Sequence, residues 1–228
     1  MRNESFLMAK KQRRTPTVKI PTYEREEALI LQGYTVVAGV DEVGRGPLAG
    51  PVMAAAVVLP SVRMDWFDEV RDSKLLSAAK RALLAPMIRH DSLAFGIGSA
   101  SVSEIDRMGI ARATMLATVR SVRKLALKPT YVLTDNVRLR GIGLPHTAVP
   151  DGDTLCLSIA AASVIAKVAR DEIMMDLDKR YPQYGFAQHK GYATAEHMER
   201  IYEIGVCDIH RKTFFPAKEI LMRPMFED

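Results

Sequence analysis

The most constraining feature of the sequence is "VAGVDEVGRGPLAGPV" at residues 37–52, where two adjacent acids close an apolar run and a glycine-rich turn follows at once. The run has the length and valine content of a buried strand. A buried charge is costly, so Asp41 and Glu42 need an ion pair, a cap or a metal ion as compensation. The chain must therefore fold so that something balances two carboxylates at the end of this strand.

Two further acids stand at similar boundaries. Asp135 ends the strand-like "YVLTD", and Asp153 lies in "DGD" ahead of the longest helical segment. Taken singly, each acid has a simple explanation. Glu42 could pair with Arg45, and Asp135 could brace a turn with the residue that follows it. Asp153 could cap the helix behind it.

Taken together, the four acids indicate a different role. The ends of central strands lie near each other in a sheet, and converging carboxylates repel unless divalent cations neutralise them. Oxygen ligands without nearby cysteine or paired histidine favour Mg²⁺ or Mn²⁺ over Zn²⁺. Two such ions, about 3.5–4 Å apart, can activate a water and stabilise the leaving oxygen of a phosphodiester. The pattern thus predicts metal-dependent phosphoryl transfer.

The order of the elements predicts an α/β domain with a mixed sheet. Strands are expected in "TVVAGVD", "GPVMAAAVVLP", "SLAFGIGSAS" and "TYVLTD", and a short extended piece in "HTAVP". Helices are expected in "EREEALILQG", in "LSAAKRALLAPMIRH" behind Ser77, over 110–127, directly after "DGD", and over 195–204 behind Thr194. Pro86 should kink or end the second of these helices. Alanines in the first half of the long helix should let it approach the sheet closely.

Several function classes are excluded by context. Gly44, Gly46 and Ala49 satisfy a loose G-x-G-x-x-A, but another strand follows where a dinucleotide-binding fold needs a helix. No G-x-x-x-x-G-K-[ST] is present, which excludes a P-loop ATPase. Two cysteines, Cys156 and Cys207, can build neither a disulfide framework nor a cysteine zinc site.

Charge and hydropathy add weaker constraints. The formal net charge of +5 resides in residues 1–22, so it says little about nucleic-acid binding by the rest of the chain. No apolar run approaches the roughly 18 residues of a membrane span, and we expect a cytoplasmic protein without membrane contact.

Lys167 and Arg170 lie off the apolar stripe of the long helix and could face the active site or water. Three histidines are spaced too widely to suggest a zinc site, and a structural or solvated role is expected for His189, His197 and His210.

Five blocks in order resemble the ribonuclease HII family of bacteria: "AGVDEVGRGPLAGPVMAAAVVL", "DSKLLS", "YVLTD", "SIAAASVIAKVARD" and "YPQYGFAQHKGYATAEH". The resemblance implies an RNase H-like fold with a mixed five-stranded sheet flanked by helices, plus a small C-terminal helical part. It implies a catalytic domain over 35–185 and a helical substrate-binding part over 186–228. The charge pattern predicts a basic, partly disordered extension over 1–34 ahead of them.

The resemblance also implies an activity. Members cleave the RNA strand of RNA–DNA hybrids and the 5′ side of single ribonucleotides embedded in duplex DNA. The reaction uses two Mn²⁺ or Mg²⁺ ions with substrate and leaves 3′-hydroxyl and 5′-phosphate ends, which initiates ribonucleotide removal. We expect a monomer and infer no protein partner. Competing interpretations are a DNA-only nuclease of the same fold and an inert hybrid-binding module.

By position, the family's catalytic and metal-binding carboxylates fall on Asp41, Glu42, Asp135 and Asp153, the acids that the strand-end pattern selects. The resemblance further implies substrate binding by Gly44, Arg45 and Gly46 at the ribose 2′-hydroxyl, by Lys74 at a phosphate, and by Tyr192 stacking on the next sugar. From the sequence alone, a buried core position is the first interpretation of Tyr192.

The chain departs from the family pattern at three positions. Relatives commonly have a lysine where Asp151 stands, and often another base near Leu155. Asn136 replaces a usual glycine, which asparagine can do because it tolerates positive φ. Asp153 is chosen over Asp151 as the ligand from its offset to the "SIAAAS" block.

Overall fold

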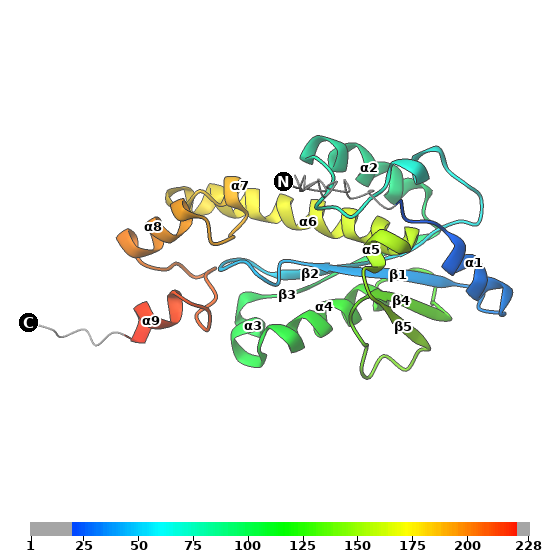
Figure 1. The fold of residues 1–228 in the computed structure, drawn as a ribbon. Coiled ribbons are helices and arrows are strands. Elements are labelled where there is room, and N and C mark those ends of the chain that lie inside the picture. The colour runs from blue at the N-terminus through cyan, green and yellow to red at the C-terminus, as the bar shows by residue number, and fades with distance from the viewer. Residues whose placement is uncertain (1–19, 223–228) are drawn as a thin grey trace, which may run out of the picture.

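The computed structural model describes residues 20–222 and has a five-stranded sheet at its centre (Figure 1). The sheet order is β3-β2-β1-β4-β5, with β1 antiparallel to β2 and parallel to β4. This arrangement confirms the predicted mixed sheet. The strands are β1 (Val37–Val43), β2 (Val52–Val58), β3 (Ala94–Ala100), β4 (Tyr131–Asp135) and β5 (His146–Val149).

Helices cover both faces of the sheet. One face carries α2 (Ala78–Asp91) and α6 (Leu157–Arg180), and the other carries α3 (Val102–Met108) and α4 (Ile110–Arg123). None of the helices formed by residues 20–222 has the length and apolar content needed to span a membrane. The remaining elements are α1 (Glu24–Leu31), η1 (Asp65–Glu69), α5 (Gly152–Leu155), η2 (Pro182–Tyr184), α7 (Phe186–His189), α8 (Ala195–Ile204) and α9 (Ala217–Met222).

Small residues let the helices lie against the sheet. The predicted close approach of the alanines of α6 is confirmed at Ala160, Ala161 and Ala162, which pack in one cluster with Ala55 and Val57 of β2. A Cβ placed on Gly39 of β1 would stand 2.3 Å from the Ser158 carbonyl carbon of α6. On the other face, a Cβ on Gly98 of β3 would stand 2.1 Å from the Ala117 oxygen of α4. Side chains at these two positions would push both helical layers away from the strands.

Three local predictions need correction. Pro86 neither ends nor interrupts α2, because it lies on the exposed side, where water can satisfy the carbonyl that it leaves without a partner. The helix over 110–127 ends at Arg123, and a separate α3 precedes it behind a capping box of Ser101 and Glu104. The long helix does not start directly behind "DGD", because the extended residue Cys156 separates α5 from α6.

An N-terminal clamp, residues 20–31, holds the break between α5 and α6. Thr22 N–H donates to the Leu155 oxygen (3.2 Å), and Leu157 N–H donates to the Thr22 oxygen (3.0 Å). Cys156 has no capping side chain, so the buried carboxylate of Glu26 accepts hydrogen bonds from Ser158 N–H (2.8 Å) and from the Ser158 hydroxyl. The start of α6 is therefore capped by a residue that lies 132 positions earlier in the chain.

Replacing Glu26 by alanine should lower the free energy of unfolding by about 2 kcal/mol, because it leaves two buried donors of Ser158 without an acceptor. Urea denaturation of Glu26→Ala and of Glu27→Ala, which alters an exposed neighbour, measures the difference. Equal midpoints for the two variants would contradict the capping role.

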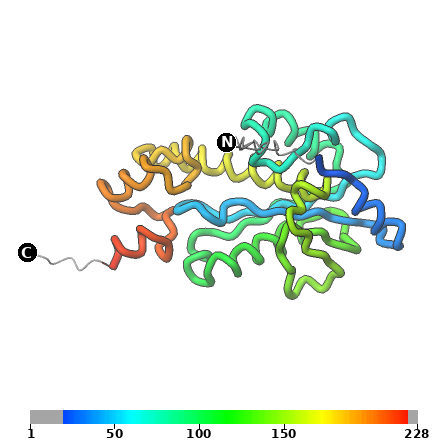
Figure 2. Tube along the Cα trace, in the orientation of Figure 1, coloured from blue at the N-terminus to red at the C-terminus, as the bar shows by residue number. Residues whose placement is uncertain are grey.

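The C-terminal residues form a smaller helical part at one end of the sheet, as Figure 2 traces from α7 to α9. Thr194 caps α8 through His197 N–H, and Gly205 ends it, as predicted. The division at residues 34 and 185 stays a prediction. The clamp nevertheless packs on the sheet domain, since Leu29 and Ile30 contact the apolar cluster of Val37 and Leu133.

Candidate active site

The structure brings Asp41 and Asp135 together on neighbouring parallel strands. β1 and β4 pair with Val40 opposite Thr134, so the next residues, Asp41 and Asp135, lie side by side at the same strand end. Adjacent strands are about 4.8 Å apart. Asp41 is buried, with one carboxylate oxygen accepting Glu42 N–H at 2.8 Å.

Asp153 reaches the same strand end through α5. Gly152 N–H donates to the Asp135 carboxylate at 2.8 Å, which docks α5 on β4. A Cβ on Gly152 would lie 2.7 Å from Ile159 Cδ1, so a larger residue here would displace the Ile159 side chain. Asp153 is buried, whereas Asp151 is exposed at φ 53°. The geometry therefore favours Asp153 over Asp151 as the member of the acid cluster, and Asp153 caps no helix.

A loop that precedes α2 adds a cation and a fifth acid. Lys74 Nζ lies 3.8 Å from Asp153 Oδ2 and 4.0 Å from Asp72 Oδ1. Lys74 N–H also donates to Asp72 Oδ1 at 3.0 Å. Lys74 is predicted from the sequence, but Asp72 is not. Its position two residues before a candidate phosphate-binding lysine is the one signal in the sequence that could have identified it. Asp72 thus extends the acid cluster beyond the four predicted carboxylates.

The acids repel each other, and their pKa values show it. Burial raises the pKa of Asp41 well above its usual value, the charges of Glu42 and Asp135 raise it further, and the Ser163 hydroxyl opposes them. Burial and the charge of Asp72 raise the pKa of Asp153 to about 6.

Burial also raises the pKa values of Glu42 and Asp135, despite the favourable charge of Lys74. Although partial burial of Lys74 acts in the opposite direction, the carboxylates of Asp72 and Asp153 raise its pKa. One lysine therefore leaves most of the negative charge uncompensated.

The cluster fits hard divalent cations that a substrate helps to bind. Within residues 20–222, no three Asp, Glu, His or Cys side chains stand close enough to enclose a metal ion by themselves. Mg²⁺ is commonly held by one or two carboxylates, with waters and substrate phosphates completing its shell. Carboxylate oxygens alone, with excess negative charge, match this mode and offer no sulfur or imidazole ligand that would favour zinc.

The glycine-rich loop follows β1 beside the acids. Arg45 forms an ion pair with Glu42 at 3.2 Å, as the sequence suggests, and this pair lies within the candidate site. Gly44 adopts φ 89°, where a side chain would be strained, and its Cβ would meet Arg170 Nε at 2.2 Å. A Cβ on Gly46 would meet nothing within 4 Å. The loop is thus closely packed at Gly44 and open at Gly46.

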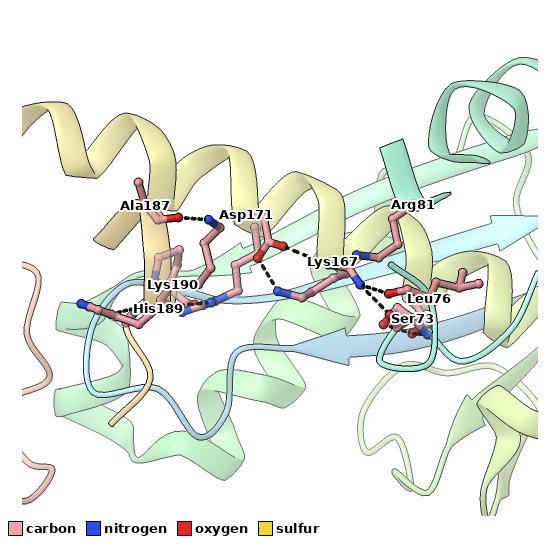
Figure 3. A network of polar contacts seen from close by, with 12 residues as sticks. Ser73, Leu76, Arg81, Lys167, Asp171, Ala187, His189 and Lys190 are labelled. Atoms are coloured by element: carbon pink, nitrogen blue, oxygen red, sulfur yellow. Dashed lines mark hydrogen bonds and ion pairs between the residues drawn. The ribbon is translucent and has the colours of Figure 1, made fainter. Parts of the chain in front are cut away.

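A polar network connects the Lys74 loop to α6 (Figure 3). The Ser163 hydroxyl donates to the Ser73 hydroxyl at 2.7 Å. Arg81 donates to the carbonyl oxygens of Ser73 (2.8 Å) and Leu76 (2.5 Å) and lies 3.8 Å from Asp171. These contacts fix the backbone on which Lys74 and Asp72 are carried.

Lys167 and Arg170 differ in environment. Lys167 is partly buried and pairs with Asp171 at 2.5 Å. Arg170 is fully buried and bonded to three backbone oxygens, so it faces neither water nor the acids, contrary to both alternatives that the sequence left open. Tyr192 is 42% exposed, which contradicts a core position and leaves its ring accessible.

The three histidines come together, although their spacing suggested separation. His189 and His197 stack with ring centroids 4.2 Å apart, and His197 Nε2 lies 3.1 Å from His210 Nε2. His210 Nδ1 accepts Cys207 N–H, so its Nε2 carries the proton donated to His197. His197 Nδ1–H in turn donates to the Tyr192 oxygen at 2.8 Å. The expected structural role is supported, because the His197 ring and the His189 backbone oxygen hold the backbone of Tyr192.

This histidine pair should make stability depend on pH. Burial lowers the pKa of both His197 and His210 to about 4, whereas an unfolded histidine titrates near 6.5. The two neutral histidines contribute fully to stability above about pH 6.5, and this contribution is lost as the pH falls toward 4. The loss occurs because the unfolded chain binds protons that the folded pair excludes. Between pH 7 and about 5, we expect the free energy of unfolding to fall by about 2 kcal/mol for each histidine.

Denaturation midpoints between pH 7 and 5 measure this loss. His210→Gln should reduce the dependence of the denaturation midpoint on pH. His90→Gln, which alters an exposed ring, should leave this dependence unchanged. If both variants show the same pH dependence as the unsubstituted protein, the pH dependence arises from other groups.

Comparisons with known proteins identify the family of the chain. A family model for ribonuclease HII matches residues 38–217. The chain belongs to the ribonuclease HII family. A ribonuclease HII of Dehalococcoides mccartyi is 48% identical over 206 residues, which cover 90% of this chain and 97% of that protein. One from Acholeplasma laidlawii is 48% identical over 86% of this chain and 95% of its own length.

Solved structures show the same fold. The ribonuclease H2 of Pyrococcus horikoshii superposes with a TM-score of 0.69 at 25% identity, covering 81% of this chain and 96% of that one. The ribonuclease HII of Archaeoglobus fulgidus, solved in complex with PCNA, gives 0.67 at 26% identity, covering 78% and 95%. The predicted RNase H-like fold is therefore confirmed, and the protein is an endoribonuclease that degrades the RNA of RNA–DNA hybrids.

Proposed function

We propose that this protein also cuts duplex DNA on the 5′ side of a single embedded ribonucleotide, giving 3′-hydroxyl and 5′-phosphate ends. The observation that carries the proposal is the meeting of Asp41, Asp135 and Asp153, from three separate segments, beside a glycine-rich loop that is open at Gly46. The exposed ring of Tyr192 follows Gly191, whose oxygen accepts Leu48 N–H of this loop. Such a site can combine phosphodiester hydrolysis with recognition of one sugar. Cleavage there would initiate ribonucleotide removal from DNA.

Asp41, Glu42, Asp135 and Asp153 would hold two Mg²⁺ or Mn²⁺ ions together with the substrate. These ions, when bound, activate the attacking water and stabilise the departing 3′-oxygen. Asp41 and Asp135 come from rigid strands, which fixes their spacing, while Asp153 is set by the contact of α5 with Asp135. The mutual repulsion of the acids provides the affinity for cations.

Five other residues would bind the nucleic acid. Lys74, whose side chain is 78% exposed, is placed to contact a phosphate near the acids. Gly44, Arg45 and Gly46 would approach the ribose 2′-hydroxyl, the group that distinguishes RNA from DNA at one position. Tyr192 would stack on the following sugar and favour a deoxyribose there. Each role combines one exposed group with a fixed backbone.

One assay tests the function. The protein is incubated in Mg²⁺ or Mn²⁺ with a DNA duplex carrying one internal ribonucleotide, an all-DNA duplex and an RNA–DNA hybrid. The proposal expects a cut immediately 5′ of the ribonucleotide, cutting of the hybrid and no cutting of DNA. Cleavage of the all-DNA duplex would indicate a DNA nuclease. Binding without any cleavage would indicate an inert hybrid-binding module.

A further inference from the structure

Arg211 is a fully buried arginine whose partners are backbone oxygens of the glycine-rich loop, residues 44–50. Its guanidinium donates to the oxygens of Gly44 (2.5 Å), Arg45 (2.9 Å) and Gly50 (3.0 and 3.1 Å). Its own N–H donates to the Leu48 oxygen at 2.8 Å. The C-terminal part therefore determines where the carbonyls of this loop point.

A second buried arginine, Arg170, supports the same region from α6. It donates to the oxygens of Ala49 (3.1 Å), Pro51 (3.0 Å) and Lys190 (3.0 Å). Its Cζ atom also lies 5.9 Å from the centroid of the Tyr192 ring. Arg170 thus ties the far end of the loop to the segment that carries Tyr192.

The inward carbonyls determine the direction of two N–H groups. In a planar trans peptide the C=O and N–H bonds point in opposite directions. The Gly44 and Arg45 oxygens point inward to Arg211, so the N–H groups of Arg45 and Gly46 point outward. Among residues 20–222 neither N–H has a hydrogen-bond acceptor, and space is open beside Gly46. Two donors are thus presented to solvent next to the acid cluster.

Burying a charge for purely structural reasons is costly. Within the described part of the chain, neither Arg170 nor Arg211 lies within 4.0 Å of a carboxylate. Burial and the neighbouring charge of Arg170 lower the pKa of Arg211 to about 9. Two cations without counter-ions are therefore kept directly beneath the loop, where a polyanionic ligand would benefit from their field.

We propose that Arg211 is a positioning residue for ribose recognition. It holds the peptide planes of the glycine-rich loop so that the Arg45 and Gly46 N–H groups donate to the oxygen of a ribose 2′-hydroxyl. This inference rests on the proposed recognition of single ribonucleotides and adds the residue that makes the loop competent for it. Arg211 itself touches no substrate, and lysine cannot replace it, because one ammonium group cannot reproduce the planar fork that binds three carbonyls.

The experiment measures binding in EDTA, where no cleavage occurs. Affinities are compared for a duplex with one ribonucleotide and for the all-DNA duplex of the same sequence. Arg211→Lys should reduce the preference for the ribonucleotide about tenfold, the equivalent of one well-made hydrogen bond, and change all-DNA affinity less than about twofold. Arg120→Lys is the matched control, because Arg120 also donates to a backbone oxygen, that of Ser99, on the opposite face of the sheet.

The outcomes separate the two proposals. A wild-type protein that shows no preference for the ribonucleotide would overturn both. A wild-type preference that Arg211→Lys retains in full would overturn the role of Arg211 alone.

A second measurement does not depend on the folding of any variant. Hydrogen exchange on the unsubstituted protein should show the Arg45 and Gly46 amides unprotected when free and protected by the ribonucleotide duplex, but not by the all-DNA duplex. Protection of these amides in the free protein would overturn the outward orientation.

Discussion

Asp41→Asn should reduce the cleavage rate of an RNA–DNA hybrid at least about a thousandfold while the protein remains folded. Asp41 is buried and interacts with the charges of Glu42 and Asp135. Asparagine keeps the shape but removes the charge that would hold divalent cations at this strand end. Because the substitution relieves repulsion between acids, the melting temperature without metal should stay the same or rise.

Single-turnover rates in Mg²⁺ and Mn²⁺, with melting curves in EDTA, test this prediction. Asp176→Asn on the exposed surface of α6 serves as the control and should leave both quantities unchanged. An Asp41→Asn variant that cleaves at more than a tenth of the normal rate would remove Asp41 from the mechanism. A variant that loses activity together with its folded structure would show only that the residue is structural.

Tyr192→Ala should slow cleavage at a single embedded ribonucleotide about 10–100-fold and cleavage of a long hybrid only a few-fold. The ring is exposed, and its backbone is fixed by the His189 oxygen and by His197 Nδ1. Aromatic stacking on a nucleotide is worth about 1–3 kcal/mol, and it can discriminate only where the following sugar is a deoxyribose. A long hybrid offers no such sugar on the cut strand.

The two substrates are compared at concentrations below KM, so that the rates report kcat/KM. Tyr192→Phe should retain most of the activity because the ring persists, and Tyr202→Ala provides an exposed tyrosine outside the site. Equal losses on both substrates for Tyr192→Ala would contradict a role in selecting the junction.

The acid cluster was predictable because it follows from strand periodicity and from the cost of burying charge. Asp41, Asp135 and Asp153 each stand at the end of an apolar run or ahead of a helix, and strand ends in one sheet lie close together. Asn136 was also predictable, since it adopts the positive φ of 52° that asparagine tolerates. In these cases the position of each residue is determined by its neighbours in the sequence.

Residues that act over long sequence separations were not predictable. Arg211 contacts Gly44 across 167 residues, and Glu26 contacts Ser158 across 132. His197 and His210 meet only because α8 and the following segment fold back on each other. A single sequence contains no local signal for such contacts. The break at Cys156 was missed for the same reason, because distant Thr22 satisfies the backbone groups on both sides of it.

The family match begins at residue 38, yet Thr22 and Glu26 bond to the junction that carries Asp153 and starts α6. Trimming the gene to the matched boundaries for expression would remove this support while leaving every family motif in place. The shortened product would then carry all four clustered carboxylates, with Asp153 at a junction that lacks its bracing. For this protein, a boundary chosen from motif coverage would exclude part of the scaffold that the motifs require.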